Sequence, residues 1–189
     1  MSHEQRLALP GDELVRQPMY ETTQAITIHA SAFRVWPWLV QIGVGRGGFY
    51  TYDALENMKG LNIHGAQRIH PEWQTLRAGD SIHISPVTPL KVQVLEPNHA
   101  LVLHTVMNPF TAEIVDREGS APRAFFDWTW AFVLEPITPL ATRLIVRARG
   151  NLKPNILRVI ALVFLKPLHL MMERGMLQGI KRRAESPSA

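Results

Sequence analysis

Hydrophobic and polar residues alternate along much of the chain, with the two-residue period of half-buried β-strands. The alternation is clearest in Ala124–Glu135, where one face carries a row of large apolar side chains: Phe126, Trp128, Trp130, Phe132 and Leu134. It continues in Arg143–Arg149, and the connection Pro136–Leu140 predicts an antiparallel hairpin. Shorter strands are predicted at Thr23–His29, Ser81–Ser85, Lys91–Glu96 and Ala100–Met107.

A helical period replaces this alternation directly after the first predicted strand. Ala32–Gln41 predicts a helix with Ser31 as its N-cap, and Pro37 inside it should keep the helix short or kinked. One face of this helix is expected to carry Phe33, Trp36, Leu39 and Val40. The glycine-rich stretch Gly43–Gly48 then predicts a tight corner, in which Arg46 could hold helix ends. A second short helix is predicted at Tyr50–Met58, before Gly60.

The last predicted element is a long helical stretch from Pro154 to Ala184, divided by Pro167. Proline is best tolerated in the first turn of a helix, so a separate segment is expected from Leu168 to Arg183. Its sheet-facing positions should be Leu168, Met171 or Met172, Gly175, Met176, Gly179 and Ile180.

The order of these elements predicts an α+β domain, in which a curved antiparallel sheet wraps around the long C-terminal helix. The sequence has 189 residues, which suits one domain. We expect this domain to span residues 22–184, preceded by an N-terminal tail or arm at 1–21 and followed by a short tail at 185–189.

Several local motifs add to this order: Trp36–Gly43, Gly45–Tyr50, Tyr52–Asp53, Leu55–Asn57, Trp130–Pro136, Thr142–Arg147, Met172–Arg174, Met176–Leu177 and Gly179–Lys181. The chain resembles the SRPBCC superfamily, the helix-grip group of START-like lipid-transport proteins and polyketide cyclases or dehydratases. The motifs resemble a bacterial subgroup without an assigned function. The resemblance implies a cavity between the sheet and the terminal helix. It also implies a hydrophobic ligand that is a lipid, sterol-like or polyketide-like.

The aromatic row and the methionines of the last helix are the predicted wall of this cavity: Trp128, Trp130, Phe132, Leu168, Met171, Met172 and Met176. Apolar stripes of this kind usually pack in the hydrophobic core. Only the family resemblance favours the interpretation that some of these residues line a pocket. His169 and Arg174 would orient a hydroxyl or a carboxylate of the ligand.

Binding without catalysis is the leading hypothesis, and two alternatives stay open. The first is a cyclase- or dehydratase-like enzyme using general acid–base catalysis, with Tyr50, Asp53, Glu56 and His169 as candidate groups. Carboxylates in such positions more often stabilise a corner or lie at the surface. The second alternative is a protein-interaction or dimerisation module, in which the partner could be a second copy of the chain, forming a homodimer.

Asp127 and the histidines are candidates for sites outside the pocket. Asp127 alternates with the aromatic row, so it should face solvent. If the register were reversed, it would be buried and need Arg147 or Arg149 as a partner. His83 and His104 could meet if their strands were neighbours. The histidine spacings match no metal motif, so neither a metal nor a cofactor is expected.

Composition limits the remaining classes of function. The chain has no cysteine, which excludes disulfides and thiolate chemistry. The net charge of +4 is too small and scattered to predict nucleic-acid binding. No signal peptide is recognised, and we expect a cytoplasmic protein. The apolar run Ile156–Leu165 is too short to span a bilayer, but it could contact a membrane transiently.

Overall fold

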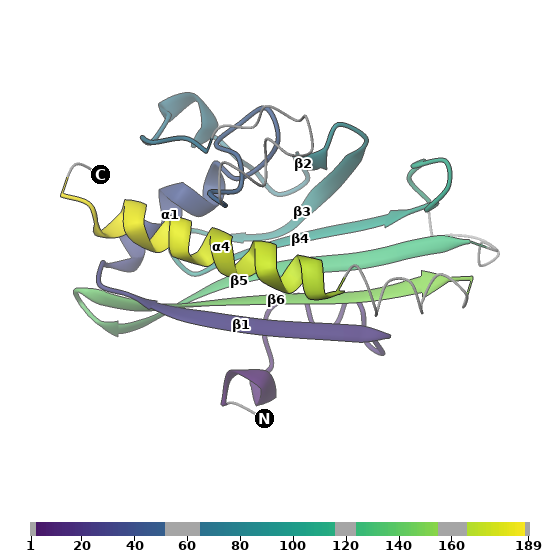
Figure 1. Cartoon of the computed structure of the whole chain (residues 1–189), viewed down its shortest axis with the longest axis horizontal. Coiled ribbons are helices and arrows are strands. Elements are labelled where there is room, and N and C mark those ends of the chain that lie inside the picture. Colours follow the sequence, from purple (N-terminus) through teal and green to yellow (C-terminus); the bar gives the residue numbers. More distant parts are fainter. Residues whose placement is uncertain (1–2, 52–64, 116–123, 155–165, 188–189) are drawn as a thin grey trace.

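The computed structural model describes residues 3–51, 65–115, 124–154 and 166–187. It confirms the predicted α+β class: a six-stranded antiparallel sheet carries a long C-terminal helix across one face (Figure 1). The strands are β1 (Tyr20–Ile28), β2 (Ser81–Ser85), β3 (Thr88–Glu96), β4 (Ala100–Met107), β5 (Phe125–Thr138) and β6 (Ala141–Lys153). The helices are α1 (Ala32–Val40) and α4 (Lys166–Glu185), and two 3-10 turns are η1 (Glu4–Arg6) and η2 (Pro71–Trp73).

The strands follow the order β1-β6-β5-β4-β3-β2, so the chain runs as a meander from β2 to β6 and β1 pairs with the last strand. The predicted hairpin between β5 and β6 is confirmed. Its strands are longer than expected, because pairing continues past Pro136 to Thr138 and Ala141. The turn is therefore reduced to Pro139 and Leu140, and the strands reach farther toward one end of the sheet.

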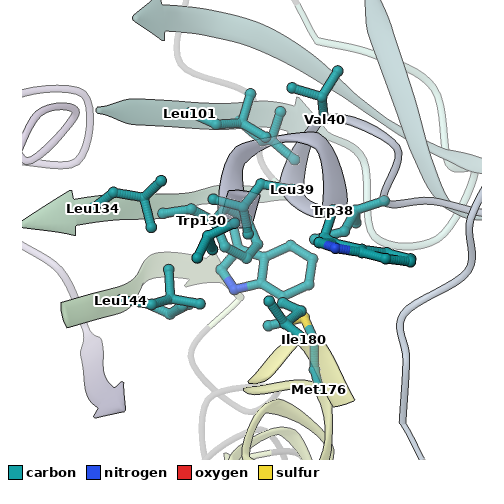
Figure 2. Packing of buried hydrophobic residues seen from close by; sticks show 14 of the residues in the cluster. Trp38, Leu39, Val40, Leu101, Trp130, Leu134, Leu144, Met176 and Ile180 are labelled. Carbon is teal, nitrogen blue, oxygen red and sulfur yellow. The ribbon is translucent and has the colours of Figure 1, made fainter. Parts of the chain in front are cut away.

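The main core lies between the sheet and the two helices. Trp130 stands opposite Leu103 of β4 on one side and Ala148 of β6 on the other. In Figure 2, Met176 and Ile180 from α4 approach Trp130 of β5. The face that carries the aromatic row is thus the face covered by α4, as the alternation in β5 requires.

Helix α1 confirms a short helix, and its predicted inner face was right for Leu39 and Val40, which are buried, but wrong for Phe33. Val35, Trp38 and Leu39 are buried, whereas Phe33 is 75% exposed. The buried set follows the i, i+3, i+4 spacing of a single stripe, which begins two positions after Phe33. Ser31 occupies the N-cap position, but its side chain makes no capping hydrogen bond.

The glycine-rich corner after α1 is confirmed. Gly43 and Gly48 exchange two backbone hydrogen bonds of 3.1 Å, and both have positive φ, which glycine adopts without strain. Arg46 donates to the carbonyl oxygens of Val40 and Trp73, so it does hold the end of α1. Of the second predicted helix, residues 52–58 lie outside the described residues.

Helix α4 is described from Lys166 onward, and the division of the helical stretch at Pro167 stays a prediction. Gly175, Met176, Gly179 and Ile180 are buried, as predicted. Residues 155–165, which include most of the apolar run, lie outside the described residues. None of the described helices is long and apolar enough to cross a bilayer.

The outer face of the sheet is covered by the N-terminal segment. Leu9 packs against Val133 and Ile145 in a second apolar cluster. Asp12 forms ion pairs with Arg147, at 2.6 Å, and with Arg149, at 3.0 Å. Residues before β1 therefore form an arm that shields arginines on the far side of the sheet from α4.

The expectation that Asp127 faces solvent was wrong. Its register is as predicted, opposite to the aromatic row, but the residue is fully buried. His104 Nε2 lies 2.8 Å from Asp127 Oδ1, so a histidine of the neighbouring strand is one of its partners. His83 cannot take part, because β3 separates its strand from β4.

Candidate functional site

A pocket of about 140 Å³ lies between the inner face of the sheet and α4. Its residues come from the segment after α1, from β2, from the aromatic row of β5 and from the first half of α4. They are Phe49, Thr51, Ile84, Trp128, Trp130, His169, Met172, Glu173 and Met176. The pocket occupies the position that the family resemblance implied, between the sheet and the terminal helix.

Aromatic rings form most of one wall. Trp128 and Trp130 stack with their ring centres 5.6 Å apart, and Phe49 lies 6.2 Å from Trp130. Alternate residues of one strand point to the same face, which brings the two indoles side by side. Met172 and Met176 face them from α4, and flexible thioethers adapt to varied apolar shapes. The wall can therefore hold a flat apolar group.

The polar side of the pocket is built around Glu173, a carboxylate that is only 2% exposed. Trp130 Nε1 donates to its Oε1 at 3.1 Å, and Gln24 Nε2 donates to its Oε2 at 2.8 Å. His169, one helical turn earlier, places Nε2 3.5 Å from Glu173 Oε1. Two titratable side chains thus converge inside the cavity.

Tyr20, the first residue of β1, is influenced by the same carboxylate. Burial raises the pKa of the Tyr20 phenol, and the nearby charge of Glu173 raises it further. The phenol of Tyr20 therefore stays protonated through the neutral range.

The structure brings five of the predicted pocket residues to the cavity: Trp128, Trp130, His169, Met172 and Met176. Phe132 lies behind Trp130, with ring centres 4.7 Å apart, and is fully buried. Leu168 is half-buried and is not among the described lining residues.

Met171 and Arg174 require correction, because both are exposed on α4, Met171 by 47%. The lining positions 169, 172, 173 and 176 form one helical stripe, which leaves positions 171 and 174 outside it. A guanidinium for a ligand carboxylate is thus not supplied by Arg174.

Glu173 is the main residue that sequence reasoning missed. Its spacing carries the signal, because it lies four residues after His169 and three before Met176. Phe49, Thr51 and Ile84 were missed too, since they come from segments whose contact with α4 depends on the tertiary fold.

The other catalytic candidates are not brought to the pocket in the described residues. Tyr50 is fully buried in the core, and its hydroxyl donates to the carbonyl oxygen of Trp38 at 2.9 Å. Burial raises the pKa of the Tyr50 phenol. Asp53 and Glu56 lie outside the described residues. In the part of the chain that the structure describes, no three acidic or histidine side chains gather as metal ligands would.

Comparison with known proteins identifies the fold. No known family profile matches the sequence, and no curated protein matches it. Solved structures do match: a protein of Nitrosomonas europaea has a TM-score of 0.51 at 10% identity, covering 94% of this chain and 98% of that one.

Two further matches have lower TM-scores. A protein of Nitrosospira multiformis has a TM-score of 0.49 at 11% identity, covering 89% of this chain and 99% of that one. Norcoclaurine synthase of Thalictrum flavum has a TM-score of 0.42 at 10% identity, covering 85% and 93%. The sheet order and the covering helix show an α+β fold of the helix-grip kind, and the Nitrosomonas protein is similar to it in fold.

Proposed function

We propose that this protein binds a small hydrophobic molecule in the pocket between the sheet and α4. The observation that carries the proposal is a cavity of about 140 Å³ whose walls include Trp128, Trp130, Met172 and Met176. Apolar side chains around an unfilled pocket lack dispersion contacts on one side, and a ligand of matching size restores them.

The volume favours one of the ligand classes that the resemblance implies. An apolar cavity of about 150 Å³ is sufficient for benzene. The space bounded by the described residues therefore suits a single ring, as in a small polyketide-like or other aromatic compound.

A benzene titration of protein carrying ¹³C-labelled methionine methyl groups tests this proposal. We expect the methyl resonances of Met172 and Met176 to shift as the ring current of benzene reaches them. Met171 is the matched control on the same helix, because it is 47% exposed and outside the pocket lining. Shifts at Met171 alone, or at none of the three, would contradict the proposal.

A second candidate function is acid–base catalysis of the cyclase or dehydratase kind. It is supported by one observation, the approach of His169 and Glu173 within the cavity at 3.5 Å. A general acid and a general base must both reach the reacting groups, and this pair lies beside the space for a ring. Catalysis would show as new ligand signals during a titration with a reactive ring compound, whereas a binder would leave the ligand unchanged.

The partner assignments from the sequence stay predictions. Transient membrane contact through Ile156–Leu165 concerns a segment whose residues are outside the described ranges. A homodimer, a docking module and a cytoplasmic location are likewise untested expectations.

A further inference from the structure

The chemistry of the pocket points to a narrower class of ligand than hydrophobic molecules in general. We propose that it selects a ring that carries a hydroxyl group, a phenol-like compound, and discriminates against ring carboxylates. This inference rests on the proposed function, because it assumes that the pocket accepts a ring. It is carried by two polar groups of the pocket, the buried Glu173 carboxylate and the half-buried His169 imidazole, whose Nε2 lies 3.5 Å from Glu173 Oε1.

Glu173 has acceptor capacity beyond its protein partners. A carboxylate offers about four lone-pair sites. Trp130 and Gln24 each donate one hydrogen bond to it, one to each oxygen. These two donors come from β5 and β1, so they fix the carboxylate in place from two strands. A ligand donor can therefore approach an acceptor that is already oriented.

His169 supplies the second observation. Its Nε2 is buried, and it makes no hydrogen bond to any of the described residues. An unsatisfied buried polar atom is costly, so a ligand group that pairs with it is favoured. This imidazole and the Trp128 ring meet edge to face, with ring centres 5.8 Å apart and planes at 82°.

A hydroxyl group fits this pair of side chains better than other small polar groups. It donates one hydrogen bond and accepts others, so it can donate to Glu173 and pair with His169 at the same time. The ring that bears it would lie against Trp128 and Trp130. Aromatic rings prefer such offset or edge contacts with other rings.

A carboxylate group on the ligand, unlike a hydroxyl group, finds no favourable partner in the pocket. The described lining contains no lysine or arginine, and Arg174 is exposed on the outer side of α4. A ligand carboxylate would therefore be placed beside a buried carboxylate without a fixed cation. Like charges in a poorly solvated site repel strongly, so binding of the ionised acid is disfavoured.

Dissociation constants of benzene, phenol and benzoate, measured on the full chain by the methionine titration, test this inference. We expect phenol to bind about ten-fold more tightly than benzene, because a hydrogen bond to a charged group is a strong one. Benzoate should bind more weakly than benzene. In Glu173→Gln, the preference for phenol over benzene should shrink to about three-fold or less, and benzoate should no longer be the weakest of the three.

His169→Phe is a second variant in case Glu173→Gln does not fold, and it should also reduce the preference for phenol. Arg174→Gln is the matched control on the exposed side of α4 and should leave all three constants unchanged. If benzene binds and phenol binds no more tightly, or if the preference survives in both pocket variants, the inference is overturned while the proposed function stands. If none of the three compounds binds, the proposed function itself fails.

Discussion

Replacing Gly179 with alanine should lower the free energy of unfolding by about 3 kcal/mol, the upper end of the usual cost of overpacking. The expected sign is opposite to helix propensity, which favours alanine over glycine by about 1 kcal/mol. A Cβ at position 179 would lie 1.9 Å from the Tyr50 carbonyl oxygen and 2.7 Å from the Tyr50 Cβ. Glycine therefore permits α4 to approach the Tyr50 backbone closely.

Tyr50 cannot easily yield, because its side chain is held on several sides. Its hydroxyl donates to Trp38, and its ring meets the Trp38 ring edge-on at 5.8 Å. The Arg183 guanidinium lies over the Tyr50 ring, 4.8 Å from its centre. The alanine variant must therefore move α4 itself, and α4 also carries the methionine wall of the pocket.

Urea unfolding of Gly179→Ala and of Gln178→Ala measures this effect. Gln178 is the exposed neighbour on the same helix, and its replacement should change the free energy of unfolding by no more than about 0.5 kcal/mol. A Gly179→Ala protein as stable as the wild type, or more stable, would show that α4 is not docked on Tyr50 as described.

Replacing Asp12 with alanine should lower the free energy of unfolding by about 3 kcal/mol as well. Asp12 Oδ2 lies 2.6 Å from Arg147 Nη1, and the Arg147 side chain is only 3% exposed. Removing Asp12 leaves the buried Arg147 charge with only neutral acceptors, Thr23 Oγ1 and the carbonyl oxygens of Leu7 and Glu4, and no carboxylate. Arg149 loses a carboxylate partner in the same variant, although it keeps Glu21.

Glu13→Ala is the matched control for Asp12→Ala, because it removes the same charge from the adjacent, exposed position. Thermal or urea unfolding should show a change within about 0.5 kcal/mol for Glu13→Ala, in line with ordinary surface substitutions. Equal effects of the two substitutions would mean that net charge, and not the arm's contact with Arg147, sets the stability.

The strands could be predicted because the signals for them are local in the sequence. Alternation in β5 fixes which side chains share a face, and the structure places Trp128 and Trp130 together on the inner one.

The errors came from contacts between distant segments. The alternation placed Asp127 correctly on the outer face, but it could not show that this face is buried and that His104 is a partner. A carboxylate such as Glu173 is normally exposed, so its helical spacing alone does not predict that it is buried. Only the sheet beneath α4, with Gln24 and Trp130 as donors, makes its burial favourable.

The rotation of α4 about its own axis could not be predicted from the sequence either. Met171 and Met172 are adjacent, and both were assigned to the pocket wall, yet only Met172 lines the cavity. One residue corresponds to about 100° of rotation on a helix, so a small error in orientation exchanges an inner for an outer side chain.

A crystal of this protein soaked with bromobenzene tests the central claim most directly, because anomalous scattering locates the bromine without ambiguity. The account predicts one bromine site inside the cavity, with the ring against Trp128 and Trp130 and beside Met176. Bromine found only at the protein surface, with the space between the aromatic row and α4 filled by the protein's own side chains, would contradict it.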